Sequence, residues 1–225
     1  MKSLYLLLDL ATFIMPAALS FDRKVQFFKQ WKSVFISSLV VGIPFLVWDI
    51  LFTHHGVWGF NPDYLTGIYI VNLPLEEVLF FIVVPFACAF IYACCRYYFR
   101  AQSFPYLNRG MMIAIPIYAG MLLFIGGGIY TEVVTISAFF VWVVAMINRQ
   151  FKYLFVAFLL SLIPFLLVNG ILTGSLSESP VVWYSNWGIT GLRIRTIPFE
   201  DVLYSFSLIV PTILLHEWIS RKWQR

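Results

Sequence analysis

The chain has 225 residues, of which 61% are hydrophobic and only 12% are charged, and its mean hydropathy is +0.86. A soluble domain carries about 25% charged residues, so this composition excludes an ordinary soluble globule and indicates a protein of the lipid bilayer. The net charge of +4 combines 15 basic and 11 acidic residues. Because the basic residues mark helix ends rather than one folded face, we expect no nucleic-acid partner.

Seven apolar stretches, each about long enough to cross a bilayer, are separated by mostly short linkers. In chain order they lie near 3–21, 33–52, 74–95, 110–129, 131–148, 153–173 and 198–219. We interpret the first stretch as a retained helix rather than a secretory signal, because Asp9 interrupts its apolar core. The sequence therefore predicts an all-α, polytopic membrane bundle with seven transmembrane helices.

Basic residues are concentrated on one side of these helices. Of the 15 Lys and Arg, only Lys2, Arg193 and Arg195 fall on one side, and the remaining twelve lie in the linkers 23–32, 96–109 and 149–152 and in the C-terminal tail. Cytoplasmic loops are enriched in Lys and Arg. We therefore expect a protein of the cell (cytoplasmic) membrane with its N-terminus outside and its C-terminus inside.

Short motifs of the first half of the chain recur in the second half. Ile43–Pro44–Phe45–Leu46 returns as Ile163–Pro164–Phe165–Leu166, and Pro74–Leu75–Glu76–Glu77 returns as Pro198–Phe199–Glu200–Asp201. Both copies cross the membrane in the same direction if one helix separates them, so the pattern predicts a 3+1+3 arrangement with a pseudo-two-fold axis along the membrane normal. The predicted units are a first three-helix repeat at 1–109, a linker helix at 110–130 and a second three-helix repeat at 131–225.

Two pairs of adjacent acids, Glu76–Glu77 and Glu200–Asp201, begin the third and seventh predicted helices near the outer face. The proline before each pair favours the first helical position, which places the acids in the first turn. Acids at a helix N-terminus can be purely structural, but two related copies inside a membrane favour a function. An adjacent pair could hold one proton between its members, which suits acid and base chemistry. We expect either Glu76 with Glu200 or Glu77 with Asp201 to meet across the axis, and the sequence leaves both open.

Aromatic residues gather around these acids. Phe80 and Tyr204 occupy matching positions about one turn past the acid pairs. Most of the aromatic residues are typical of the interfacial belt, but ring faces in a dry cavity can also stabilise a carbocation. Asp49 is expected either to tune the acid pair or to hydrogen-bond between helices. The candidates for substrate or carbocation binding are Phe80, Tyr204, Phe81, Trp48, Asp49 and Trp58.

Neither a metal nor a cofactor is expected. Cys88, Cys94 and Cys95 lie in one apolar stretch without CxxC spacing and are interpreted as reduced packing residues. His54–His55 has no second ligand cluster near it in the sequence, and the chain contains no dinucleotide fingerprint. Glu217 is expected to lie at the membrane interface.

The doubled acid motif resembles the lycopene cyclase family of bacteria, archaea and fungi, whose halves are separate subunits or one fused chain. The resemblance is carried by Pro74–Glu77 and Pro198–Asp201, by Trp48–Asp49 and by Gly56–Pro62, and it covers essentially the whole chain. It implies an integral-membrane carotenoid cyclase that closes the ψ-ends of lycopene into β-ionone rings, giving γ-carotene and β-carotene. The implied substrate is lycopene or a related acyclic carotenoid within the lipid bilayer.

The resemblance also implies a redox-neutral reaction that needs an acid, a base and a dry aromatic wall, and no redox cofactor. The second copy departs from the first, with Asn169 in place of Asp49 and Asp201 in place of Glu77, so the two halves need not be equivalent in catalysis. The catalytic candidates are Glu76, Glu77, Glu200 and Asp201.

The main alternative is a small-solute transporter with a 3+1+3 layout and a central polar site. Carriers place their substrate groups near mid-membrane, whereas these acids begin helices at the outer face. A retinal-binding protein normally needs a lysine in its last helix, and 198–219 contains none. A structural membrane subunit stays open, as do the number and type of rings, the number of active sites and the oligomeric state.

Overall fold

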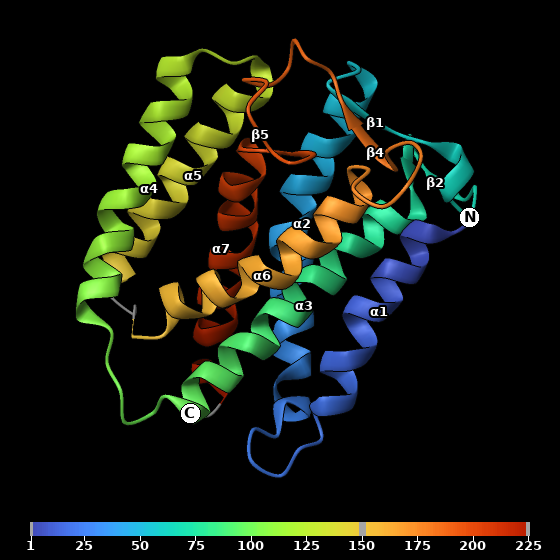
Figure 1. Cartoon of the computed structure of the whole chain (residues 1–225). Helices are drawn as coiled ribbons and strands as arrows, with labels where there is room; N and C mark the ends of the chain where they lie inside the picture. The colour runs from blue at the N-terminus through green and yellow to red at the C-terminus, as the bar shows by residue number, and fades with distance from the viewer. Residues whose placement is uncertain (1, 149–151, 224–225) are drawn as a thin grey trace.

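A computed structural model describes residues 2–148 and 152–223, and over this part of the chain it is all-helical apart from short strands (Figure 1). The basic residues Arg149 and Arg225 lie outside the described residues. The prediction of an all-α protein is confirmed. The helices are α1 Leu4–Leu19, α2 Trp31–His54, α3 Leu75–Tyr98, α4 Pro105–Ile125, α5 Ile129–Asn148, α6 Leu154–Leu172 and α7 Glu200–Trp223, with 3-10 turns η1 Phe27–Gln30 and η2 Pro62–Tyr64.

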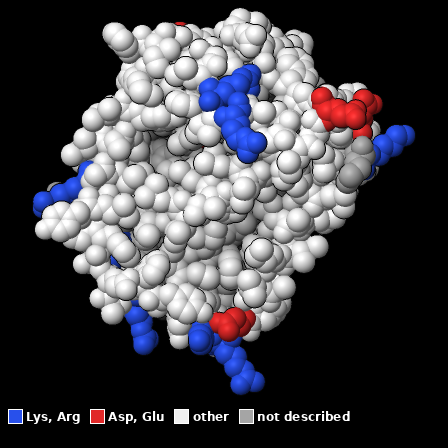
Figure 2. All heavy atoms as spheres, viewed as in Figure 1, with Lys and Arg blue, Asp and Glu red and all other residues white. Residues whose placement is uncertain are grey.

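Six of the described helices, α2 to α7, are long and apolar enough to cross a membrane. Helix α1 is also apolar but has 16 residues, or about 24 Å at 1.5 Å per residue. Large apolar side chains point outward along the bundle, including Phe124 and Leu167. Figure 2 shows a mostly uncharged face, with several basic groups along its lower and left margins and a further basic group nearer the top. The chain is therefore a multi-pass membrane protein, because only lipid suits such a surface.

The helix contacts of the first half are repeated in the second half. Helix α1 packs on α3 as α5 packs on α7, and α2 packs on α3 as α6 packs on α7. The halves are joined by contacts of α2 with α7, of α3 with α6 and of α3 with α7, and Figure 1 shows α6 crossing in front of α3. Helix α4 packs mainly on α5. Helices α3 and α7, which begin with the acid pairs, thus lie at the centre of the bundle.

Three short antiparallel strand pairs connect the helices at the end of the bundle where α3 and α7 begin (Figure 1). One pair precedes α3 and another precedes α7, and each follows a glycine in the left-handed region, Gly67 with φ +84° and Gly191 with φ +81°. Only glycine adopts this conformation at no cost. The third pair, β1 with β4, joins the two halves. The strands are β1 Trp58–Phe60, β2 Tyr69–Ile70, β3 Leu73–Pro74, β4 Val182–Tyr184, β5 Arg193–Ile194 and β6 Ile197–Pro198.

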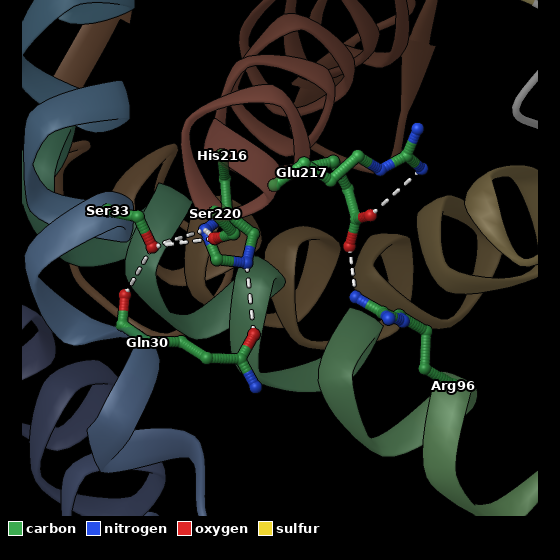
Figure 3. A network of polar contacts seen from close by, with 7 residues as sticks. Gln30, Ser33, Arg96, His216, Glu217 and Ser220 are labelled. Atoms are coloured by element: carbon green, nitrogen blue, oxygen red, sulfur yellow. Dashed lines mark hydrogen bonds and ion pairs between the residues drawn. The ribbon is translucent and has the colours of Figure 1, made fainter. Parts of the chain in front are cut away.

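A polar network ties the opposite ends of α2, α3 and α7 together (Figure 3). The Ser33 hydroxyl lies 2.9 Å from Nδ1 of His216, which is fully buried. Glu217 forms ion pairs with Arg96 of α3 and, at 3.4 Å, with Arg221. Glu217 is buried against the neighbouring helices, with an exposed fraction of 6%, and the two cations compensate its charge.

Candidate active site

The four acids of the doubled motif occupy the first turns of α3 and α7 and are buried, with exposed fractions between 0% and 9%. Each helix starts slightly later than the prolines predicted. Pro74 is the N-cap of α3 with extended backbone, φ −63° and ψ 149°, and Pro198 ends β6, two residues before α7. The prolines therefore end the hairpins, and the acids lie in the first turn of each helix.

The first acid of each motif binds backbone rather than facing open space. Oε1 of Glu76 accepts a hydrogen bond from the N–H of Thr66 at 2.7 Å, and Oε1 of Glu200 accepts one from the N–H of Thr190 at 2.6 Å. The hydroxyl of Thr131 on α5 also donates to Oε1 of Glu200, at 2.7 Å. These acids anchor the loop before each hairpin to the helix that follows it.

The second acid of each motif points elsewhere, because neighbouring side chains on a helix diverge by about 100°. Glu77 and Asp201 line one cavity near the end of the bundle where α3 and α7 begin. Of the two pairings that the sequence left open, the structure brings together Glu77 and Asp201. Glu76 and Glu200 are not among the residues that line this cavity.

Aromatic rings form much of the cavity wall. Phe80, Tyr204 and Trp58, three of the candidate binding residues, line it. Trp48 lies behind Tyr204, with the ring centroids 5.2 Å apart, and Phe81 packs against α2 away from the cavity. Trp48 and Phe81 thus support the wall rather than form it. The other aromatic residues of the wall are Tyr5, Phe60, Tyr130, Phe165 and Tyr184.

Glu77 lies beside a second carboxyl group. The hydroxyl of Tyr5 on α1 donates to Oε2 of Glu77 at 2.7 Å. The carboxyl group of Asp49 on α2 interacts electrostatically with that of Glu77. Asp49 in turn accepts hydrogen bonds from the indole N–H of Trp58 and, at 3.4 Å, from the hydroxyl of Thr53. The carboxyl group that lies beside Glu77 is therefore that of Asp49 on α2, not that of the adjacent Glu76.

Asp201 lies among neutral donors instead. The hydroxyl of Tyr130 donates to Oδ1 at 2.7 Å, while the amide of Asn169 and the hydroxyl of Tyr184 donate to Oδ2 at 2.7 Å and 3.1 Å. Burial raises the pKa of the Tyr184 phenol well above its usual value, and the neighbouring Asp201 raises it further. Tyr184 therefore keeps its proton and remains a donor. Three donors suit the acceptor sites of an ionised carboxylate.

Tyr5 and Tyr130 are functional candidates that the sequence reasoning missed. They begin the first helix of each half, and they precede the acids to which they donate by 72 and 71 residues. This nearly constant spacing is the signal that could have revealed them. Tyr184 was not among the candidates either. It pairs with Trp58 in the β1–β4 register, so the two strands supply one donor to Asp49 and one to Asp201.

The cavity contains carboxyl groups but no partner cation. Within residues 2–148 and 152–223, both ion pairs involve Glu217, and no group of three or more His, Cys, Asp and Glu could hold a metal ion. The carboxyl groups are therefore compensated by hydrogen-bond donors and by one another. Such a site can donate a proton at one wall and accept one at the other.

A comparison with protein families identifies the chain. The family model described as lycopene cyclase matches residues 2–95 and 127–219. The matched stretches contain both acid motifs, and the unmatched stretch between them contains α4. The chain therefore belongs to the lycopene cyclase family, whose members are enzymes of carotenoid cyclisation with carotenoid substrates. No curated protein and no solved structure matches the chain, and nothing in these comparisons supports a transporter.

Proposed function

We propose that this member of the lycopene cyclase family is a lycopene β-cyclase that converts lycopene to γ-carotene and β-carotene by redox-neutral acid–base catalysis. The observation that carries the proposal is the unequal setting of two corresponding acids at one aromatic cavity. Glu77 lies beside another carboxyl group, whereas Asp201 receives three hydrogen bonds. The reaction needs these two roles: one group that gives a proton and another that takes one.

The Asp49–Glu77 pair is the proton donor. Two buried carboxylates without a cation repel each other, so the pair shares one proton. Glu77 is the member on the cavity wall, and it transfers this proton to the terminal double bond of the substrate. The hydroxyl of Tyr5, 2.7 Å from Oε2 of Glu77, stabilises the carboxylate that remains.

Protonation leaves a tertiary carbocation, and the π electrons of a nearby double bond attack it and close a six-membered ring. The positive charge moves to a ring carbon during this step. The ring faces of Phe80, Tyr204 and Trp58 on the cavity wall stabilise it without offering a nucleophile. An apolar wall also excludes water, which would otherwise capture the cation as an alcohol.

Asp201 then removes a ring proton, and the electrons of that C–H bond form the ring double bond of the β-ionone product. Its three donors hold Asp201 in the ionised form until this step. One proton enters the substrate and one leaves, so the product is an isomer and no electrons are exchanged. The proposed reaction therefore requires no redox cofactor. Return of a proton from Asp201 to Glu77 resets the site.

We place this site in a 3+1+3 bundle that crosses the cell membrane seven times, with the N-terminus outside. The units are 1–109, the linker helix 110–130 and 131–225, and their pseudo-two-fold axis lies along the membrane normal. Support comes from the repeated helix contacts, from the two hairpins and from the unmatched stretch around α4. Helix α1 serves as a span because it contacts α3 as the 20-residue α5 contacts α7.

The test is expression in a host that accumulates lycopene, followed by chromatography of the extracted pigments. We expect β-cyclised carotenoid with the native chain. Glu77→Gln and Asp201→Asn should each lower the rate by about 10²–10⁴-fold, the usual contribution of general acid–base catalysis. Glu132→Gln is the matched control, because Glu132 is an exposed acid in the first turn of α5, and it should keep the native rate.

Protein amounts in the membrane are measured for every variant, so that a loss of pigment conversion is expressed per folded molecule. Unchanged lycopene with the native chain at full expression would contradict the cyclase function. Native rates for both amide variants would contradict the assigned acid and base, and an ε-ring product would contradict the proposed direction of proton removal.

A further inference from the structure

A narrow groove between α3 and α6 adjoins the aromatic cavity. Phe80, Phe165 and Asn169 line both spaces, so these three side chains form the wall that the groove and the cavity share. The rest of its wall is mainly apolar and includes small side chains. It includes Val84, Ala87 and Cys88 from α3, Ser161, Pro164 and Val168 from α6, and Thr12 from α1.

The shape of the groove suits a long, thin, apolar molecule. From Phe80 to Ile91, the α3 wall of the groove is eleven residues long, or about 16 Å. The groove runs along the helix axis into the bundle, away from the helix N-terminus that holds Glu77. Pro164 of α6 lines the groove and is itself exposed, so the groove opens toward the outside of the bundle. A carotenoid dissolved in the bilayer could thus enter the groove laterally from the lipid. A polar solute would find few hydrogen-bonding groups there.

The same place in the other half of the chain is filled. By the repeat, the α3–α6 contact corresponds to the α7–α2 contact, and Val168 corresponds to Trp48. The Trp48 ring centroid lies 5.2 Å from that of Tyr204 and 5.5 Å from that of Phe45. Phe45 and Tyr204 are themselves 5.2 Å apart. Between α2 and α7, the ring of Trp48 therefore fills the space with an aromatic cluster. At the corresponding place between α3 and α6, the smaller Val168 leaves the groove open.

We propose that each chain holds one polyene site rather than two, with the carotenoid chain in the α3–α6 groove and its end group between Glu77 and Asp201. Trp48 closes the equivalent place between α2 and α7. This inference rests on the proposed function and deepens it by specifying where the substrate lies. It follows that the two ends of one carotenoid are cyclised in separate binding events, with release and reversal between them.

The test introduces the tryptophan of the α2–α7 contact at the corresponding position of the α3–α6 groove. Val168→Trp places the ring of Trp48 in the groove, and Leu167→Trp adds the same ring one residue earlier, on the exposed side of α6. We expect Val168→Trp to lower cyclisation more than about tenfold, because the indole ring would occupy the space that the polyene needs, and Leu167→Trp to keep the native rate. Equal, native rates for both variants would overturn the proposal.

A binding measurement separates failure of the groove from failure of the proposed reaction. Lycopene that co-purifies with Glu77→Gln is compared with lycopene that co-purifies with Glu77→Gln/Val168→Trp, so turnover is not required. Loss of pigment only in the double variant supports binding of lycopene in the groove. This holds even if the native chain leaves lycopene unchanged and the proposed cyclase function is wrong. Equal pigment in both overturns the groove, even if the native chain cyclises lycopene.

A second variant guards against misfolding. Ala87→Leu narrows the groove from the α3 wall, and melting temperature and gel-filtration profile identify folded variants. We expect Ala87→Leu to lower both pigment retention and cyclisation. A folded Ala87→Leu protein with native retention and native rate would overturn the proposal.

Discussion

Replacing Tyr130 by Phe tests whether Asp201 works as an ionised base. The Tyr130 hydroxyl donates to Oδ1 of Asp201 at 2.7 Å, whereas the other two donors both bind Oδ2. Tyr130→Phe keeps the ring in the cavity wall and removes only the donor to Oδ1. A hydrogen bond to a charged group contributes about 1.5–3 kcal/mol, and each 1.36 kcal/mol changes a rate tenfold. If the bond helps to keep Asp201 ionised, the cyclisation rate should fall by about 10- to 150-fold.

The assay is the initial rate of cyclised carotenoid per folded enzyme, measured in lipid vesicles that contain lycopene. Substrate affinity should change little, because the aromatic ring remains, so the loss should appear in kcat. Tyr92→Phe is the matched control: Tyr92 is also buried and lies beside a carboxylate, Glu217, near the other end of α3. It should lose stability but keep its turnover. A native kcat for Tyr130→Phe, or an equal loss for Tyr92→Phe, would refute the reasoning.

Three further predictions concern the loop anchor, the strand pair and the order of products. Glu76→Ala should lower the melting temperature by the equivalent of about 1–3 kcal/mol, because the hydrogen bond from the N–H of Thr66 to the buried Glu76 carboxyl group is lost; unchanged melting would contradict the anchoring role. Gly59→Ala should destabilise the protein in a denaturation assay, since a Cβ would clash with the Trp183 ring, whereas Gly110→Ala, with open space around it, should be neutral; equal effects would count against this packing. In a time course at limiting enzyme, the monocyclic product should appear before the bicyclic one, and bicyclic product from the start would argue against separate binding events.

The helical architecture could be predicted because a bilayer leaves few choices. An apolar stretch in lipid must satisfy its own backbone, so composition and length alone predict helices. The positions of the acid pairs followed from the prolines that precede them, although α3 begins one residue and α7 two residues later than predicted. The doubled motif also predicted that both pairs begin equivalent helices.

The rotation of those helices could not be predicted in the same way. Whether Glu76 or Glu77 faces the cavity depends on which of the two accepts the hydrogen bond from the N–H of Thr66. The position of that N–H depends on the path of the hairpin. Interactions between residues far apart in the sequence could not be predicted either. Glu217 is buried because Arg96, 121 residues away in the sequence, reaches it across the bundle, and no local pattern around Glu217 contains that information.

Duplication alone would produce two equal acids, which cannot move a proton from one place to another. The two halves differ at a pair of neighbouring positions, Trp48–Asp49 on α2 and Val168–Asn169 on α6. At the second position, a carboxyl group meets Glu77 in one half, and an amide donates to Asp201 in the other. At the first position, a tryptophan packs against the wall in one half, and a valine borders a groove in the other. Two adjacent positions thus make the halves different. The first half has the proton donor and a closed helix contact, and the second half has the proton acceptor and the open groove. The cavity between them can use both acids.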